Sequence, residues 1–143
     1  MPELNLVGSA LSIGLSCIGS AIGCWISGAA SHAAMGRTDE GHGKFIALSI
    51  APSTQMIYGF LLSRDIAAAV QGGTLSPLSA IAFGLFAGLA ICLSAIYQGK
   101  VAATGIQASL KQPGVFGKTF LIVGVIETTA LFAFIFSRLL IGA

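Results

Sequence analysis

The stretch TFLIVGVIETTALFAFIFS, residues 119–137, decides the fold. These 19 residues lie between Lys118 and Arg138, and they hold one charged side chain, that of Glu127. A helix needs about 20 predominantly apolar residues to cross the hydrocarbon core of a membrane. The stretch lacks the alternation of apolar and polar residues that a strand of a membrane barrel would need. It therefore predicts a membrane-spanning helix with a carboxyl group near its middle.

Three more stretches carry no charge over a comparable length: residues 4–36, 45–63 and 66–99. Turn-forming sequences separate the stretches. They are GRTDEGHG at 36–43, GGT at 72–74 with Pro77 behind it, and QPG at 112–114. The sequence therefore predicts an all-α membrane protein with four transmembrane helices, at about 5–31, 45–69, 75–107 and 119–140. The third helix must extend past the hydrocarbon, because Lys100 lies within it.

The composition agrees with a membrane setting. Of the 143 residues, 55% are hydrophobic and 8% are charged, whereas a soluble domain has about 25% charged residues. So few charges exclude a soluble enzyme and a disordered chain, and a net charge of +2 is too small for nucleic-acid binding. The first apolar run is too long for a cleaved signal peptide, and no basic residue precedes it, so we expect it to span the membrane.

The basic residues indicate the orientation in the membrane. Four of the seven lie at the loops after the first and third spans: Arg37, Lys44, Lys111 and Lys118. Loops rich in Lys and Arg stay on the cytoplasmic side. We therefore expect a multi-pass protein of the cell (inner) membrane, with both hairpin loops in the cytoplasm and both termini on the opposite side.

The chain contains an internal repeat. A shift of 74 residues aligns 69 pairs without a gap, and 16 of them are identical. The identities keep the loop-edge Gly-Lys pairs (43–44 and 117–118) and the helix-end Ser-Arg pairs (63–64 and 137–138) in one register, which chance similarity of apolar stretches would not do. We predict two tandem helical hairpins, residues 1–72 and 73–143. Both have the same topology, which argues against an inverted-repeat transporter.

Small residues follow the first and third spans at helical spacing, in the pairs Gly19/Gly23, Gly84/Gly88 and Ala95/Gly99. Such spacing lets helix backbones approach each other closely in lipid. The number of small residues suggests that these two spans are the crowded inner helices of a ring of copies.

Glu127 is the most informative residue. It lies nine positions after Lys118 and eleven before Arg138, which is the middle of a hydrocarbon core about 30 Å thick. An ionisable group at this depth costs roughly 3 kcal/mol on insertion scales. A functional site is therefore a better explanation than a protonated side chain that only cross-links helices.

Other polar residues share the depth of Glu127. In an antiparallel hairpin that turns at residues 112–113, Gln98 lies opposite Glu127. The repeat maps Glu127 onto Ser53, which puts Thr54 and Gln55 in the same layer of the second span. The strongest polar residues of the spans therefore fall at one depth.

The second span adds a helical pattern to this layer. Ala51, Thr54, Gln55 and Tyr58 are spaced three, four and seven residues apart, so they share one helix face. Pro52 lacks an N–H group and disturbs the preceding turn, which frees backbone carbonyls to accept other hydrogen bonds.

The layer can supply about five hard oxygen ligands, which suit a hard cation. They are the side-chain oxygens of Thr54, Gln55 and Gln98, one backbone carbonyl and the Glu127 carboxylate. One carboxylate balances a monovalent ion, whereas a divalent ion requires more negative charge. A proton needs only the carboxyl group, so the additional oxygens favour Na+, with H+ as the alternative. No organic cofactor is expected.

At these residues the chain resembles the proteolipid rotor subunit, subunit K, of V-type (V/A-type) ATPases. The matching stretches are APSTQMIYGF at 51–60, IYQGKVAATGIQ at 96–107 and GVIETTALF at 124–132. The resemblance covers the whole chain, and the motifs PxTQ, QGK and ET at matched depth make it specific. It implies an ion-translocating subunit, not itself the site of ATP cleavage, that couples transport of Na+ (or H+) to ATP hydrolysis or synthesis.

The resemblance to sodium-binding members of this family implies roles for single residues. The ion ligands would be the Glu127 carboxylate, the side-chain oxygens of Thr54, Gln55 and Gln98, and the backbone carbonyl of Ala51. Tyr58 would donate a hydrogen bond to Glu127 and hold it closed. Ala51 is smaller than the residue expected there, which matters little for a backbone ligand.

The resemblance also implies partners. Copies of the chain would form a homo-oligomeric ring in the lipid, turning against a stator membrane subunit that bears an essential arginine. Loops 32–43 and 108–118 would contact the central stalk, with His32 and His42 solvated or in contact with the stalk. Because Ser53 replaces a second carboxylate, the subunit offers one ion per four helices, which favours ATP-driven pumping over ATP synthesis.

Two other classes of protein compete with this interpretation. A small proton-coupled multidrug exporter also has four helices and one membrane Glu, but it predicts neither the 74-residue repeat nor amides at the depth of Glu127. A purely structural proteolipid leaves Glu127 unexplained.

Overall fold

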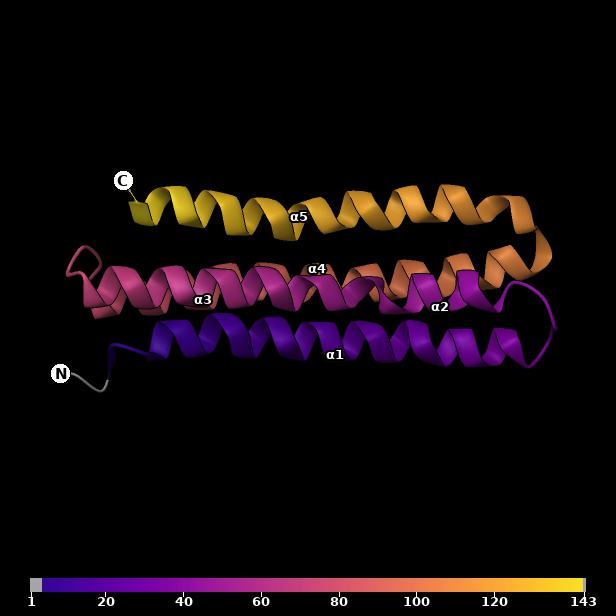
Figure 1. The fold of residues 1–143 in the computed structure, drawn as a ribbon, viewed down its shortest axis with the longest axis horizontal. Coiled ribbons are helices and arrows are strands. Elements are labelled where there is room, and N and C mark those ends of the chain that lie inside the picture. Colours follow the sequence, from indigo (N-terminus) through magenta and orange to yellow (C-terminus); the bar gives the residue numbers. More distant parts are fainter. Residues whose placement is uncertain (1–3, 143) are drawn as a thin grey trace.

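The described residues form four long helical segments, which lie side by side in an elongated bundle (Figure 1). The computed structural model describes residues 4–142, so Glu3 lies outside the described residues. The four segments are α1 (Val7–Met35), then α2 (His42–Ile50) continued by η2 (Ala51–Thr54) and α3 (Gln55–Gln71), then α4 (Pro77–Lys111), and last η3 (Pro113–Val115) with α5 (Phe116–Gly142).

The prediction of four transmembrane helices is confirmed. Each of the four segments is long and apolar enough to cross a membrane, and residues 4–142 contain no strand. The helices are longer than predicted, because the first continues to Met35 and the third to Lys111. The third has 35 residues, or about 52 Å at 1.5 Å per residue, so it extends beyond the hydrocarbon as predicted.

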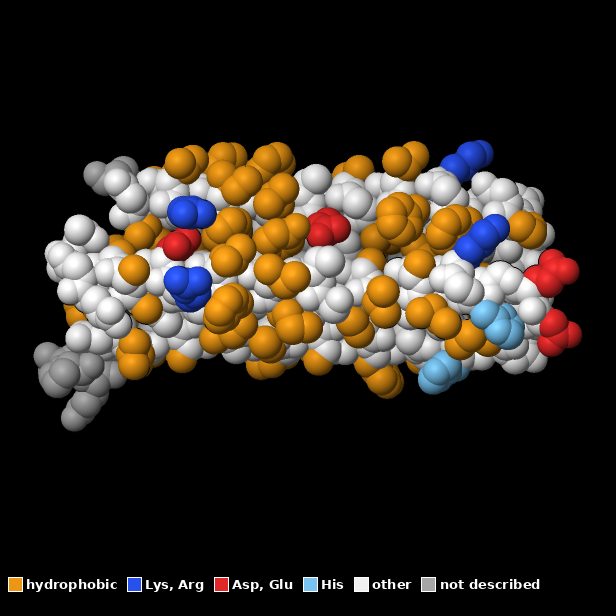
Figure 2. Space-filling view, in the orientation of Figure 1, with side chains coloured by type: hydrophobic (Ala, Val, Ile, Leu, Met, Phe, Trp, Pro, Cys, Tyr) orange, Lys and Arg blue, Asp and Glu red, His pale blue; other side chains and the backbone are white. Residues whose placement is uncertain are grey.

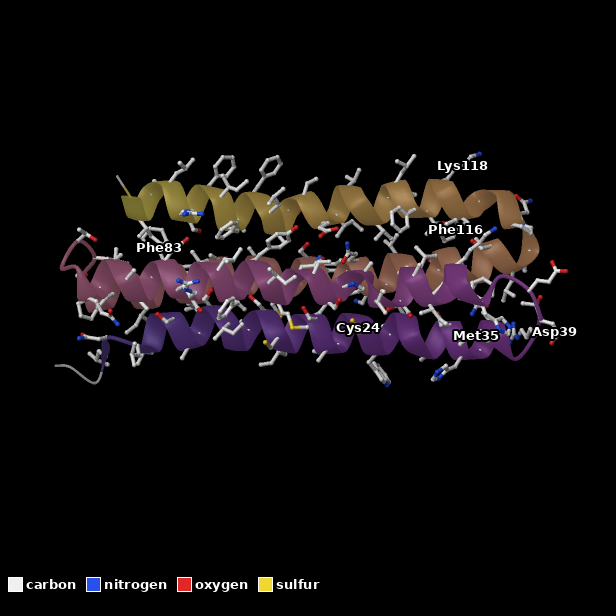
Figure 3. All side chains as sticks on the ribbon, in the orientation of Figure 1. Cys24, Met35, Asp39, Phe83, Phe116 and Lys118 are labelled. Carbon is white, nitrogen blue, oxygen red and sulfur yellow. The ribbon has the colours of Figure 1, made fainter. Side chains whose placement is uncertain are left out.

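The bundle has two distinct ends. The start of α1 and the end of α5 lie at one end, and the loops after α1 and α4 lie at the other (Figure 1). Asp39 and Lys118 mark this loop end (Figure 3). On the face in Figure 2, hydrophobic side chains cover most of the length, and charged side chains gather towards the two ends with one acidic exception near the middle. Which end faces the cytoplasm stays a prediction.

The predicted turns end the helices by ordinary local chemistry. Gly41 (φ 79°) and Gly73 (φ 75°) adopt the left-handed backbone conformation, which glycine reaches without steric cost. Ser76 caps α4, since its hydroxyl accepts a hydrogen bond from the N–H of Ser79 at 3.1 Å. Pro77 occupies the first turn of α4, where its missing N–H costs nothing.

Small residues bring α1 and α4 into backbone contact. A Cβ atom on Gly84 would collide with the backbone of Gly8, and one on Gly99 would collide with the backbone of Gly23. In lipid, helix association depends on such close packing, because hydrophobic burial gives no net drive there. The predicted close approach of the first and third spans is confirmed within the chain.

Gly19→Ala should destabilise the bundle, because a Cβ at Gly19 would collide with the backbone of Cys92 on α4. Such overpacking costs about 1–3 kcal/mol. Gly28→Ala is the matched control on the same helix, since a Cβ there meets no atom of another described helix within 4 Å. We expect thermal unfolding in detergent, followed by circular dichroism, to show a lower midpoint for Gly19→Ala. Equal midpoints for the two variants would contradict this packing.

Serine hydroxyls on α1 join it to the second segment. Three of them donate across the helix contact to backbone carbonyls: Ser12 to Gly59 at 3.1 Å, Ser27 to Ser49 at 2.9 Å and Ser31 to Phe45 at 2.7 Å. These bonds satisfy buried hydroxyls, as the interior of a membrane protein requires. They also fix the position of the second segment along the bundle axis, and with it the positions of Thr54 and Gln55.

Candidate ion-binding site

Pro52 interrupts the second segment at the predicted place. The α-helix ends at Ile50, a 3-10 turn covers Ala51–Thr54, and α3 resumes at Gln55. Three successive carbonyls at this break, of residues 49–51, accept hydroxyl hydrogen bonds. The donors are Ser27 at 2.9 Å, Ser53 at 2.7 Å and Thr54 at 3.0 Å. The bonds from Ser53 and Thr54 reach the residue three positions earlier, as is common inside helices, whereas the bond from Ser27 comes from α1.

A chain of amide hydrogen bonds crosses the bundle at this level. The Thr54 hydroxyl lies 3.3 Å from Oε1 of Gln55, and Nε2 of Gln55 donates to Oε1 of Gln98 at 2.8 Å. Nε2 of Gln98 then donates to the backbone carbonyl of Val123 at 3.0 Å. Both glutamine side chains are fully buried. Buried amides are costly without hydrogen-bond partners, so this series of hydrogen bonds holds the side-chain amide of each glutamine in one orientation.

Glu127 lies beside this chain of amides with a partner of its own. The hydroxyl of Tyr58 donates to Oε1 of Glu127 at 3.2 Å, and the Tyr58 ring stacks on Phe134 with centroids 6.2 Å apart. Glu127 is half-buried. Stacking limits the rotation of the tyrosine ring, so its hydroxyl has a defined position relative to the carboxylate.

The structure brings the sequence-predicted residues to one level from three helical segments. Thr54, Gln55 and Gln98 form one hydrogen-bonded group, and Tyr58 and Glu127 form another. Among residues 4–142 no hydrogen bond joins Glu127 to either glutamine. The two groups are nonetheless adjacent, because Gln98 bonds the carbonyl of Val123, one helical turn before Glu127 on α5.

Two backbone partners near the site escaped the sequence analysis. Val123 accepts the hydrogen bond from Gln98, and Ile126 accepts one from the hydroxyl of Ser94 at 2.9 Å. Every residue type has a backbone carbonyl, so the residue type does not reveal such an acceptor. The one available signal is that Val123 lies one helical turn before Glu127.

The charges around the site are few. Within the described part of the chain no three His, Cys, Asp or Glu residues are grouped so that they could hold a metal ion. An ion pair between Arg138 and Asp65, 3.4 Å apart, lies nearer the terminal end. His42 is the first residue of α2, with its Nε2 2.7 Å from the carbonyl of Thr38 in the preceding loop. The layer therefore combines one carboxylate with several neutral oxygens.

Tyr58→Phe should weaken retention of a cation at Glu127, because it removes the hydroxyl that orients the carboxylate. A hydrogen bond to a charged group contributes about 1.5–3 kcal/mol, so we expect sodium binding to weaken by about tenfold or more. Tyr97→Phe is the matched control, since Tyr97 is 54% exposed and its ring faces Lys100. Binding of sodium-22 to the purified protein measures the difference. Equal weakening by both variants would contradict the role of Tyr58.

Comparison with known proteins adds independent information. The family model for the C subunit of ATP synthase matches residues 7–63 and 81–140. The chain is 36% identical over 138 residues to "A-type ATP synthase subunit K" of Methanocaldococcus jannaschii, covering 96% of this chain and 61% of that protein. It is 37% identical over 135 residues to "V-type sodium ATPase subunit K" of Enterococcus hirae, covering 88% of this chain and 82% of that protein.

Proposed function

The chain belongs to the family of ATP synthase C subunits, and on this premise we propose that it is the proteolipid rotor subunit of a V/A-type rotary ATPase. It carries Na+ on Glu127 and couples ion transport to ATP hydrolysis or synthesis. The observation that carries the proposal is the contact of Glu127 with Tyr58 beside the buried pair Gln55 and Gln98. The four membrane-length helices agree with this role.

The proposed sodium site uses the oxygens of this layer. Glu127 supplies the negative charge, and the other ligands are the side-chain oxygens of Thr54, Gln55 and Gln98 with the carbonyl of Ala51. Na+ must leave its hydration shell to enter, so replacement oxygens must lie within the layer. A single carboxylate among neutral oxygens suits a monovalent ion. The sodium ATPase named for the Enterococcus relative supports this choice over H+.

We propose that copies of the chain form a ring in the membrane. The two hairpins of each copy carry one mid-membrane carboxylate, that of Glu127. The chain spans 61% of the length of the Methanocaldococcus relative. The ring turns against a stator subunit that bears an essential arginine, and the central stalk binds the end at which Asp39 and Lys118 lie (Figure 3). One ion per four helices favours work in the pumping direction.

Gentle detergent extraction tests this proposal. We expect native mass spectrometry of the extracted protein to give one large, stable complex containing many copies of this chain. A dimer would contradict the rotor and would support the alternative, a small multidrug exporter. That alternative gives no reason for buried amides at the level of Glu127.

A further inference from the structure

We infer that Ser94 is a positioning residue for ion binding, and the inference rests on the proposed function. Its hydroxyl donates to the backbone of α5 and not to the carboxyl group of Glu127. It thereby holds α5 at the point from which that carboxyl group extends.

Two donors on α4 converge on the backbone at Glu127. The Ser94 hydroxyl, in a residue 4% exposed, donates to the carbonyl of Ile126 at 2.9 Å. This carbonyl and the N–H of Glu127 belong to the same peptide group. In the α-helix that N–H donates to the carbonyl of Val123, which also accepts from Gln98 at 3.0 Å. Ser94 therefore binds the peptide group that contains the N–H of Glu127, and Gln98 binds the carbonyl to which that N–H donates.

Two other hydroxyl groups on this hairpin bond within their own helix. Thr104 donates to the carbonyl of Val101 at 2.9 Å, and Thr128 donates to that of Val125 at 2.6 Å. Such local bonds are a common way to satisfy a hydroxyl inside a helix. The hydroxyl of Ser94 instead reaches the neighbouring helix, so its bond fixes the height and rotation of α5 relative to α4.

The first hairpin provides an internal comparison. The counterpart of Ser94 in the 74-residue repeat is Ser20, which is 1% exposed. The hydroxyl of Ser20 finds no hydrogen-bond partner among residues 4–142. The counterpart of Ile126 is Pro52, in the 3-10 turn, and that of Glu127 is Ser53. Across the described residues, the hairpin that carries the carboxylate therefore has a cross-helix bond at this repeat position, and the first hairpin has none there, although other serines of α1 bond the second segment at other levels.

A small displacement of α5 would weaken ion binding, because the carboxylate of Glu127 must stay close to the other ligands. A binding group must be held within about 0.5 Å of its productive position by the residues behind it. The Glu127 side chain accepts from Tyr58 at 3.2 Å, which is longer than the range of about 2.5–3.0 Å usual for an O–H···O hydrogen bond. A small sliding or rotation of α5 would take the carboxylate away from Tyr58 and from the amide oxygens.

Carbodiimide labelling of purified rings tests the inference. A hydrophobic carbodiimide reacts with the protonated carboxyl of Glu127, and bound sodium prevents the reaction. The measured quantity is the sodium concentration that halves the labelling rate. We expect Ser94→Ala to raise it about three- to tenfold, as for the loss of one hydrogen bond. Ser94→Cys, which keeps the shape but donates weakly, should raise it less.

Ser20→Ala is the matched control and should leave the half-protecting concentration unchanged, because its hydroxyl has no partner within residues 4–142. Native mass spectrometry checks ring assembly for each variant. If Ser94→Ala does not assemble into rings, the half-protecting sodium concentration of Ser94→Cys tests the inference instead. Equal sodium protection in wild type and the Ser94 variants would overturn this inference alone, as would equal shifts in Ser94→Ala and Ser20→Ala. Absence of sodium protection in the wild type would overturn the proposed sodium transport, and this inference with it.

Discussion

Glu127→Gln is expected to abolish ATP-driven sodium transport while leaving the subunit inserted in the membrane. The amide has nearly the shape of the carboxyl group, so the helix packing survives. It carries no negative charge, however, and a bare cation at mid-membrane depth is strongly disfavoured without one. Uptake of sodium-22 into proteoliposomes that contain the assembled ATPase measures the effect. Transport at the wild-type rate would exclude Glu127 as the carrier.

Carbodiimide labelling identifies the same carboxyl group without transport. The reagent attacks protonated carboxyl groups and partitions into lipid, so we expect it to modify Glu127 and to leave Asp39 and Glu40 in the loop unmodified. Sodium should protect Glu127, and more so at higher pH, where protons compete less. Glu40→Gln makes the same chemical change at an exposed position, and it should leave the labelling unchanged. Labelling confined to the loop would reject the assignment.

The sequence predicts the four helices for a simple physical reason, and the depth of the site in the membrane stays a prediction. Charged residues are costly in hydrocarbon, so most of them lie outside it and delimit the spans. Lys118 and Arg138 delimit the last span in this way, and Glu127 lies near its middle. Antiparallel pairing about residues 112–113 then assigns Gln98 to the same level. The bond between Gln55 and Gln98 agrees with this assignment.

Depth alone does not predict rotation about the helix axis. Gln98 and Glu127 share a level, yet Gln98 bonds the carbonyl of Val123, and Glu127 bonds Tyr58. These partners depend on how α4 and α5 are turned towards each other, and close backbone packing sets that rotation. The bond from Ser94 to Ile126 is beyond sequence reasoning for the same reason, since any residue could supply that carbonyl.

Replacing both Gln55 and Gln98 by leucine is expected to abolish sodium binding. Both side chains are fully buried and bonded to each other, and leucine has a similar volume, so the pair can be removed together without leaving an unpaired amide. Each lost oxygen ligand should weaken sodium binding by about 1–3 kcal/mol, the usual effect of an unmade bond to a charged group. Binding of sodium-22 to purified rings measures the loss.

Proton transport should respond differently to the same double variant. A proton needs only the carboxyl group of Glu127, which still titrates, so ATP-driven proton uptake should persist in part. Gln107→Leu, nine residues from Gln98 on the same helix, is the matched control and should bind sodium like the wild type. Undiminished sodium binding in the double variant would remove the amides from the site. Absence of sodium binding in the wild type at high pH would leave a proton-coupled rotor, in which the buried amides only join α3 to α4.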